Sequence, residues 1–301
     1  MDTLLLRPGL TSAWSLTAPN RRSRISDKRS YIQTFRADVE ALATAAHLGL
    51  EAPVPSCPGW IVTNIVIHLG TVYRGWTHVL RAAGAEWPLD IRKRVLEQTF
   101  PELVGLFERG EQGMTAWTIP NGLIEWFGQG AAEVEAALRH ADLDEWFWQP
   151  PEWPSLGDQR LGLFLRAANI ETAVHRWDAQ LAHERTAPID RAVAELGIEQ
   201  ALREMIPMNR WYVREYRKAP ARQGSGEIYR FQQTDGDGTW IVRFQGDSTI
   251  VEGRPGRADV VIHGSASDLL LFLWHRIPAE RVKATGDTTL LDRYFDLVPP
   301  L

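Results

Sequence analysis

Apolar residues recur at helical spacing in four long stretches of the first 190 residues. The stretches cover residues 30–47, 63–84, 123–140 and 159–183. A period of about 3.6 residues places apolar side chains on one face of a helix, where they can pack against neighbouring helices. Four long amphipathic helices with one long crossing connection predict a four-helix bundle.

Two connections interrupt this pattern. Between residues 85 and 122, Pro88, Pro101 and Pro120 divide the chain, which predicts short helical pieces. Residues 146–157 contain three prolines and three tryptophans, and predict an ordered loop or a short strand pair. We expect both segments to shape a substrate pocket beside the bundle.

The second part of the chain changes to a period of two. After Pro188, residues 190–205 predict one more helix, followed by mixed residues up to a break at 219–226. Alternation of apolar and polar residues then predicts strands at 227–231, 239–244, 249–252 and 259–263.

Turn and capping residues complete the prediction for this part. Asp235-Gly236-Asp237-Gly238 is typical of a hairpin turn between the first two strands. Ser265 or Ser267 can cap a helix that runs to Arg276, and a last helix should cover residues 288–295. The result is a smaller α+β domain with an antiparallel sheet that carries helices.

The chain therefore divides into three predicted parts: an N-terminal extension at 1–29, the bundle at 30–187 and the α+β domain at 188–301. The extension is basic, and we expect a mobile arm or a surface wrap; a nuclear or export address is the alternative.

Composition narrows the classes of function. With 33 basic and 38 acidic residues the formal charge is −5, and the charges are interspersed, which gives no support to nucleic-acid binding. No run approaches the ~18 apolar residues of a membrane span. A single cysteine excludes an intrachain disulfide and a cysteine-based zinc cluster, and a reducing cytoplasm is the natural setting.

Candidate chemistry centres on Glu171 and His175. Four residues apart in a predicted helix, they lie on one face and can both bind one divalent metal. His68 and this pair also stand on the apolar faces of their helices, unlike His140 at a helix end. A buried carboxylate must pair with a cation or bind a metal. Arg166 and Arg176 offer the salt-bridge alternative, and spacing by itself leaves both open.

Cys57, Asp178 and several tryptophans are secondary candidates. Cys57 lies ahead of a helix and could serve as a nucleophile, but apolar packing is the favoured role. Asp178 lies one turn beyond His175 and is a candidate partner for that ring rather than a ligand. The nearby tryptophans suit a pocket with apolar walls or ordinary core positions: Trp60, Trp76, Trp126 and Trp177.

Three motifs carry a family resemblance. They are PSCPGW at 55–60 followed by NIVIHLG at 64–70, ETAVHRWD at 171–178, and SDLLLFLWHRIPA at 267–279 with TGD at 285–287. Together they resemble the mycothiol-dependent maleylpyruvate isomerase family, whose members are DinB-like metal-binding four-helix bundles with a C-terminal domain shaped like sterol carrier protein. The resemblance covers about residues 30–300.

The resemblance implies a divalent metal, usually zinc, held by His68, Glu171 and His175 with open coordination positions. It also implies mycothiol, the low-molecular-weight thiol of actinobacteria, as cosubstrate, activated as a metal-bound thiolate. In the isomerase, addition of that thiolate to a cis double bond permits rotation before elimination. In the family an arginine binds the substrate carboxylate, and by the resemblance this arginine corresponds to Arg276. Here it follows His275, where the family more usually has a small residue. The alternative for Arg276 is a charge that stabilises the end of a helix.

We therefore expect a metal-dependent enzyme that uses mycothiol for S-transfer, addition or cis-trans isomerisation of a small electrophilic or unsaturated substrate. No nucleic acid and no membrane are expected as partners. Two alternatives stay open at this point: a hydrolase in which the metal activates water, and a DinB-like binding protein without chemistry.

Overall fold

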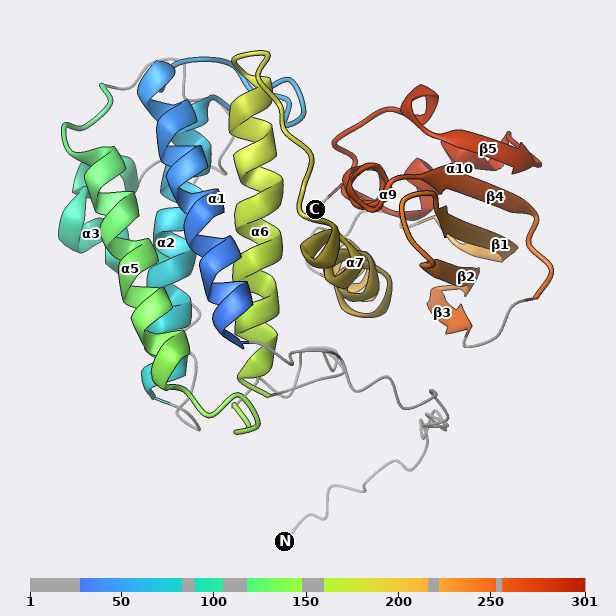
Figure 1. The fold of residues 1–301 in the computed structure, drawn as a ribbon, viewed down its shortest axis with the longest axis horizontal. Coiled ribbons are helices and arrows are strands. Elements are labelled where there is room, and N and C mark those ends of the chain that lie inside the picture. Colours follow the sequence, from blue (N-terminus) through green and yellow to red (C-terminus); the bar gives the residue numbers. More distant parts are fainter. Residues whose placement is uncertain are drawn as a thin grey trace, which may run out of the picture.

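The protein has a helical part beside a sheet part (Figure 1). The structure, a computed structural model, describes residues 28–82, 90–104, 118–147, 160–215, 222–252 and 256–300. The predicted N-terminal arm falls almost wholly on residues outside this description. None of the described helices combines the length and the apolar character needed to cross a membrane.

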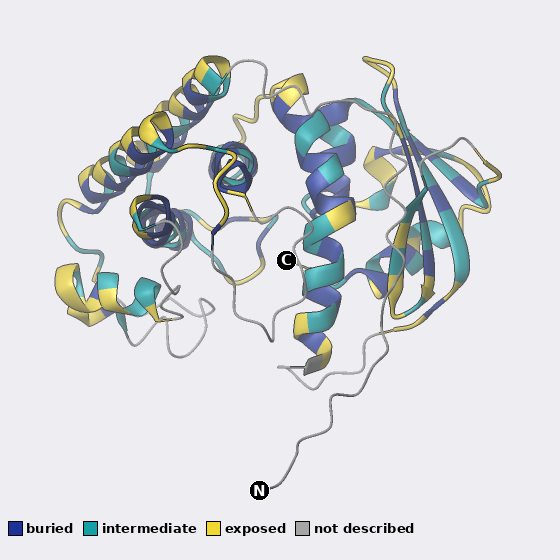
Figure 2. Ribbon diagram, turned by 90° about the horizontal axis from the view of Figure 1, so that it is seen from below, coloured by how far each residue is buried: buried dark blue, intermediate teal, exposed yellow. Residues whose placement is uncertain are grey.

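Four long helices form the first part, as the apolar period predicts. They are α1 Lys28–Leu48, α2 Val62–Arg81, α5 Leu123–His140 and α6 Gly162–Leu181. Figure 1 shows them side by side. Figure 2 shows buried residues on their inner faces and exposed residues on their outer faces. The predicted four-helix bundle is confirmed.

A glycine sets the distance between α2 and α5. A Cβ atom at Gly70 would lie 2.1 Å from the ring of Trp126, so only glycine allows this close packing. Arg74 lies over the same ring, with its guanidinium carbon 4.2 Å from the ring centroid. Because His68 lies two residues before Gly70, this contact also fixes the position of His68 in the bundle.

The connections within the bundle are only partly described. Residues 85–122 contain α3 Ile91–Thr99 and the 3₁₀ turn η1 Pro101–Leu103, in agreement with the predicted short helical pieces. Most of the predicted loop at 146–157 lies outside the described residues. At its ends, Trp146 and Arg160 form an antiparallel bridge.

The helix that follows the bundle is longer than predicted. It consists of α7 Arg191–Gln200, the π-helical turn η2 Ala201–Met205 and α8 Ile206–Glu215. The prediction that it ends at Met205 is wrong. Pro207 reads as a helix breaker, but its missing N–H falls just after the π-helical turn, where the regular α-helical hydrogen bonds are already interrupted.

A five-stranded sheet forms the second part, in the order β3-β2-β1-β4-β5. The predicted hairpin is present, with β1 paired antiparallel to β2. The strands are β1 Gly224–Gln233, β2 Thr239–Gly246, β3 Ser248–Glu252, β4 Val260–Gly264 and β5 Lys283–Gly286.

Two features of the sheet differ from the prediction. The sheet is mixed rather than wholly antiparallel, because β4 pairs with β1 in parallel while the other three pairs are antiparallel. Alternation along a strand reveals its two faces but not its direction, so a crossover between β3 and β4 leaves no trace in the pattern. The edge strand β5 was not predicted, because four residues are too short to show a period.

Helices α9 Ala266–Leu273 and α10 Leu290–Leu297 pack on this sheet. Of the two predicted caps, Ser265 is the one that caps α9, because its Oγ accepts a hydrogen bond from the backbone N–H of Asp268 at 3.1 Å, whereas Ser267 Oγ accepts from the Ile189 N–H. The prediction that α9 reaches Arg276 is wrong by three residues. His275 has φ of +60° and reverses the chain, and Arg276 N–H then bonds back to the Leu271 carbonyl at 2.8 Å.

Helix α6 belongs to both parts of the molecule. Phe164 and Ala168 pack in the bundle core, whereas Val174 and Trp177 pack in the core of the sheet domain. A Cβ at Gly197 would lie 2.8 Å from Leu270, so this glycine lets α7 lie closely against α9. The helix that carries Glu171 and His175 is thus held from two sides.

Candidate metal centre

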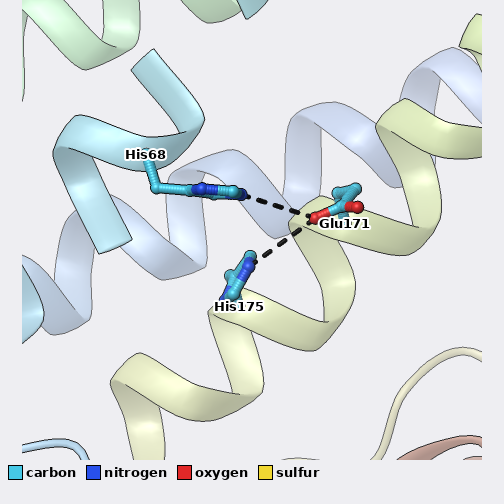
Figure 3. A group of neighbouring side chains, drawn as sticks. All are labelled: His68, Glu171 and His175. Carbon is cyan, nitrogen blue, oxygen red and sulfur yellow. Dashed lines mark ion pairs between the residues drawn. The ribbon is translucent and has the colours of Figure 1, made fainter. Parts of the chain in front are cut away.

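His68, Glu171 and His175 come together between α2 and α6 (Figure 3). Glu171 Oε2 lies 3.6 Å from His68 Nε2 and 3.6 Å from His175 Nε2. One ligand atom from each residue lies within 4.8 Å of the other two. Bonds of about 2.0–2.1 Å in a tetrahedral zinc site place ligand atoms about 3.3 Å apart, so the spacing is close to that of a site for one ion.

The local sequence accounts for this convergence. Glu171 and His175 are one helical turn apart on α6, and both face α2. A buried hydrogen bond of 2.6 Å joins the Tyr73 and Thr172 hydroxyls, and so ties α2 to α6 next to the trio. His68 lies five residues before Tyr73 on α2, and its side chain reaches Glu171 on α6.

The trio is open on one side. The His175 side chain is only 3% exposed, whereas His68 is 18% and Glu171 21% exposed. Trp60 covers the trio from the turn before α2, with its ring stacked on His175 at a centroid distance of 6.0 Å and tilted against His68 at 5.6 Å. The arrangement gives a deep, aromatic-walled position with access along His68 and Glu171.

The electrostatics fit a cation between the three side chains. Burial lowers the pKa of His175, although the contact with Asp178 acts in the opposite direction, so the ring is neutral at neutral pH. Burial would raise the pKa of Glu171, but His68, His175 and Arg276 hold it below its usual value. A neutral His175 that donates its Nδ1–H to Asp178 presents its Nε2 lone pair toward the ionised Glu171 carboxylate, and a metal ion between them satisfies both acceptors.

Asp178 lies behind the trio and contacts His175, Ser56 and Arg276. Its fully buried carboxylate lies 2.9 Å from His175 Nδ1 and accepts hydrogen bonds from Ser56 Oγ at 2.6 Å and from Arg276 Nε at 3.0 Å. Burial raises its pKa, but Arg276 and His175 outweigh burial and bring the pKa to about 2. Asp178 therefore stays ionised and orients His175. Its spacing from His175 in the sequence predicts this contact.

The candidate nucleophile Cys57 and the candidate substrate-binding Arg276 both contact Asp178. Cys57 is buried in the bundle core, with Sγ 3.6 Å from Asp178 Oδ2; burial and the Asp178 charge raise the pKa of the thiol to about 12. A thiol with that pKa is a poor nucleophile. Arg276 comes from the sheet domain, and its side chain is 6% exposed. It donates hydrogen bonds to Asp178 and to the Trp274 carbonyl.

Both arginines of the salt-bridge alternative for Glu171 have other carboxylate partners. Arg176 Nε donates to Asp38 at 3.0 Å, and Arg166 lies 3.8 Å from Glu204.

Of the four candidate tryptophans, all of them in the described part of the chain, Trp60 is the one whose ring contacts the trio. Trp76 packs on Phe164, Trp126 covers Gly70, and Trp177 lies in the sheet-domain core.

Sequence reasoning missed Arg92. Its Nη2 lies 3.2 Å from His68 Nδ1, on the ring edge that faces away from Glu171. Arg92 comes from α3, in a connection without a strong period, and no spacing rule links it to His68.

Comparisons with known proteins agree with the fold described above. The family described as the mycothiol maleylpyruvate isomerase N-terminal domain matches residues 29–180, and the C-terminal domain of the same family matches residues 192–293. Crystal structures of the mycothiol-dependent maleylpyruvate isomerase and of a histidine-to-alanine variant are similar in fold. Both have a TM-score of 0.54, cover 86% of this chain and 93% of their own, and are 12% and 13% identical. No curated protein sequence matches the chain.

Proposed function

The chain belongs to the mycothiol maleylpyruvate isomerase family of enzymes, and on that premise we propose that it binds one divalent metal ion, zinc foremost, and uses mycothiol as cosubstrate. The observation that carries the proposal is the convergence of His68, Glu171 and His175, with ligand atoms within 4.8 Å of one another and an open side. Two imidazoles and a carboxylate are ligands that zinc accepts in catalytic sites with a free position.

The bound ion would supply one chemical effect: it lowers the pKa of a thiol, so that a thiolate forms at neutral pH. The protein's own residues supply the rest. Asp178 holds His175 with its Nε2 lone pair toward the ion position, and Trp60 limits access of water. Cys57 stays protonated because its pKa is about 12, which leaves the external thiol as the nucleophile.

The reaction class we propose is S-transfer, addition or cis-trans isomerisation of a small electrophilic or unsaturated substrate. Family membership supports this class, and the 12–13% identity to the solved isomerases does not extend their substrate to this chain. We also propose that Arg276 binds a substrate carboxylate, through one of its three nitrogens. Its Nε and Nη1 are bonded to Asp178 and the Trp274 carbonyl, so its Nη2 is the group that can reach a ligand. A reducing cytoplasm remains the proposed setting.

Metal analysis of variants tests the proposal. Purified protein should carry about one divalent ion per chain, and His68→Ala and Glu171→Ala should each lose it, because two ligands hold zinc far more weakly than three. His140→Ala is the matched control, since His140 is exposed at the end of α5. Full metal content in both site variants would contradict the proposed ligands.

A thiol screen tests the second half of the proposal. The metal-loaded protein should act on electrophilic or unsaturated acids only when mycothiol is present. Activity that persists without a thiol would favour a hydrolase that activates water. Ligand binding that is unchanged by metal removal, with no turnover, would favour a binding protein.

A further inference from the structure

A short connection joins the bundle to the sheet domain. It covers residues 182–190, between the end of α6 at Leu181 and the start of α7 at Arg191 (Figure 1). Most of these residues are exposed, but Ile189 is buried. Because exposed connections are the more mobile parts of a fold, this one keeps a fixed path where hydrogen bonds hold it.

Arg176 binds the connection to α6. Its buried guanidinium donates from Nη1 to the Ala187 carbonyl at 2.6 Å and from Nη2 to the Pro188 carbonyl at 3.1 Å. The Asp38 carboxylate on α1 accepts from its Nε at 3.0 Å, which keeps the charge paired. Hydrogen bonds from a charged donor are stronger than neutral ones, so residues 187 and 188 are held firmly against the bundle.

Ser267 binds the next residue of the connection to the sheet domain. Its Oγ accepts the backbone N–H of Ile189 at 3.0 Å, in a buried contact. Ser267 lies in the first turn of α9, so the connection and this helix are joined directly. The close packing of Gly197 against Leu270 also holds α7 on α9. The connection, α7 and α9 therefore form one unit.

The other end of α9 returns to α6. Arg276 follows this helix, and its Nε donates to Asp178 at 3.0 Å. Asp178 lies two residues after Arg176 on α6, so the contacts form a closed ring that leaves α6 and returns to it. Helix α9 has 8 residues and is about 12 Å long. Since a helix of this length is stiff, a shift at Ser267 displaces Arg276 at the other end.

We propose that Ser267 is a positioning residue, which holds Arg276 where its Nη2 can bind a ligand carboxylate. The inference rests on the proposed function, in which Arg276 binds that carboxylate, and it adds the contact that places the arginine. An arginine that is fixed before binding loses less side-chain freedom when the ligand arrives, and therefore binds it more tightly.

Ser265 provides a matched control on the same helix. Its Oγ accepts the backbone N–H of Asp268 at 3.1 Å, a contact within the start of α9. Ser265→Ala and Ser267→Ala each remove one hydrogen-bond acceptor from this start, so both variants should lose a similar amount of stability. Ser267→Ala also releases the Ile189 N–H of the connection.

The side-chain signal of Arg276 tests the positioning without a ligand. Its Nε–H is bonded to the buried Asp178 carboxylate and should exchange slowly with water in ¹⁵N NMR. Arg276→Lys, which has no Nε–H, identifies the signal. Ser267→Ala should speed the exchange about fivefold, the effect of one lost hydrogen bond, and Ser265→Ala should leave it unchanged. Equal exchange rates in the two serine variants would overturn the role of Ser267.

Fumarate binding to the zinc-loaded protein tests the consequence for the ligand. Ser267→Ala should bind this unsaturated dicarboxylate about fivefold more weakly than the unchanged protein, and Ser265→Ala should bind it equally well. Because Ser267 acts through Arg276, Ser267→Ala combined with Arg276→Gln should bind no more weakly than Arg276→Gln alone. Additive losses would indicate a general structural effect and would overturn the proposal.

The outcomes also separate this inference from the proposed function. A loss of fumarate affinity in Arg276→Gln with none in Ser267→Ala would overturn the role of Ser267 and leave that of Arg276 standing. Equal fumarate affinity in Arg276→Gln and the unchanged protein would overturn the carboxylate-binding role of Arg276, and the proposal for Ser267 with it.

Discussion

His275 is the residue with the most unusual conformation near the site. Its φ of +60° is a value that glycine and asparagine adopt more readily, and its ring is wedged against Phe295 at a centroid distance of 4.7 Å. Its Nε2 is buried without a hydrogen-bond partner in the described part of the chain. The turn at His275 directs Arg276 toward Asp178. The strained backbone at His275 therefore helps to place the arginine.

His275 should make folding sensitive to mild acid. Burial, with a smaller contribution from Arg276, lowers the pKa of His275 to about 4. The unfolded chain, with a pKa near 6.5, therefore binds more protons between these values, and stability is lost as the pH falls from about 6.5 to 4. Over this pH range the free energy of unfolding should fall by about 3 kcal/mol.

His275→Asn tests this expectation, because asparagine tolerates the left-handed backbone and does not titrate. Urea unfolding of the metal-free protein from pH 7 to pH 4 should show a shallower decline in the variant. His140→Asn, at an exposed position, should keep the original decline. Equal slopes in all three proteins would contradict the assignment to His275.

At the scale of the elements, α2 links the packing of the bundle to its chemistry. The same helix carries His68, the contact at Gly70 and the Tyr73 hydroxyl that bonds Thr172 on α6. A shift of α2 against α5 or α6 therefore moves one ligand relative to the other two.

Gly70→Ala should destabilise the protein by about 1–3 kcal/mol and reduce its zinc affinity, because the new Cβ would lie 2.1 Å from the Trp126 ring. Gly75→Ala is the matched control on the same helix. Its Cβ would meet Ile91 at an ordinary 3.5 Å, and alanine favours the helix, so this variant should be as stable as the unchanged protein or more stable. Unfolding by urea and zinc titration measure both effects. Equal behaviour of the two variants would show that the α2–α5 contact is looser than described.

At the scale of the whole molecule, an ion pair between the two parts supports the site. Arg276 follows α9 in the sheet domain, and Asp178 lies on α6 in the bundle. Helix α6 also contributes to both cores. The sheet domain thus supplies none of the three proposed ligands, but it supplies the cation that keeps Asp178 ionised behind His175.

Arg276→Gln should cost about 3–5 kcal/mol of unfolding free energy, because it leaves the buried Asp178 charge without its cation. Arg36→Gln removes an exposed partner of Glu135 and should leave the free energy of unfolding almost unchanged. Urea unfolding of both metal-free variants gives the comparison, and zinc titration should show a weaker site in Arg276→Gln alone. A similarly small loss of unfolding free energy in both variants would mean that water solvates the Asp178 carboxylate once Arg276 is removed.

The sequence predicts what depends on local period. The helix at 123–140 is found with the predicted bounds, and the hairpin around Asp235–Gly238 is in place. The proximity of Glu171 and His175 follows from one helical turn. Their role as ligands, with His68 as the third, is a prediction that still awaits a metal measurement.

What the sequence does not predict depends on long-range geometry. Arg276 and Asp178 are 98 residues apart, and their contact requires both the turn at His275 and the docking of the sheet domain. The contact of Arg92 with His68 requires α3 to fold back on α2. Strand β4 runs parallel to β1 because of a crossover, which apolar alternation cannot encode.

The buried thiol described above has a practical consequence. Cys57 is the only cysteine in the chain, and with a pKa of about 12 it is almost wholly protonated at neutral pH. Alkylating reagents attack thiolates, so a reagent such as iodoacetamide should consume free mycothiol and leave the protein intact. Any inhibition by such a reagent would then report on the cosubstrate, and the enzyme should regain full activity when fresh thiol replaces the alkylated pool.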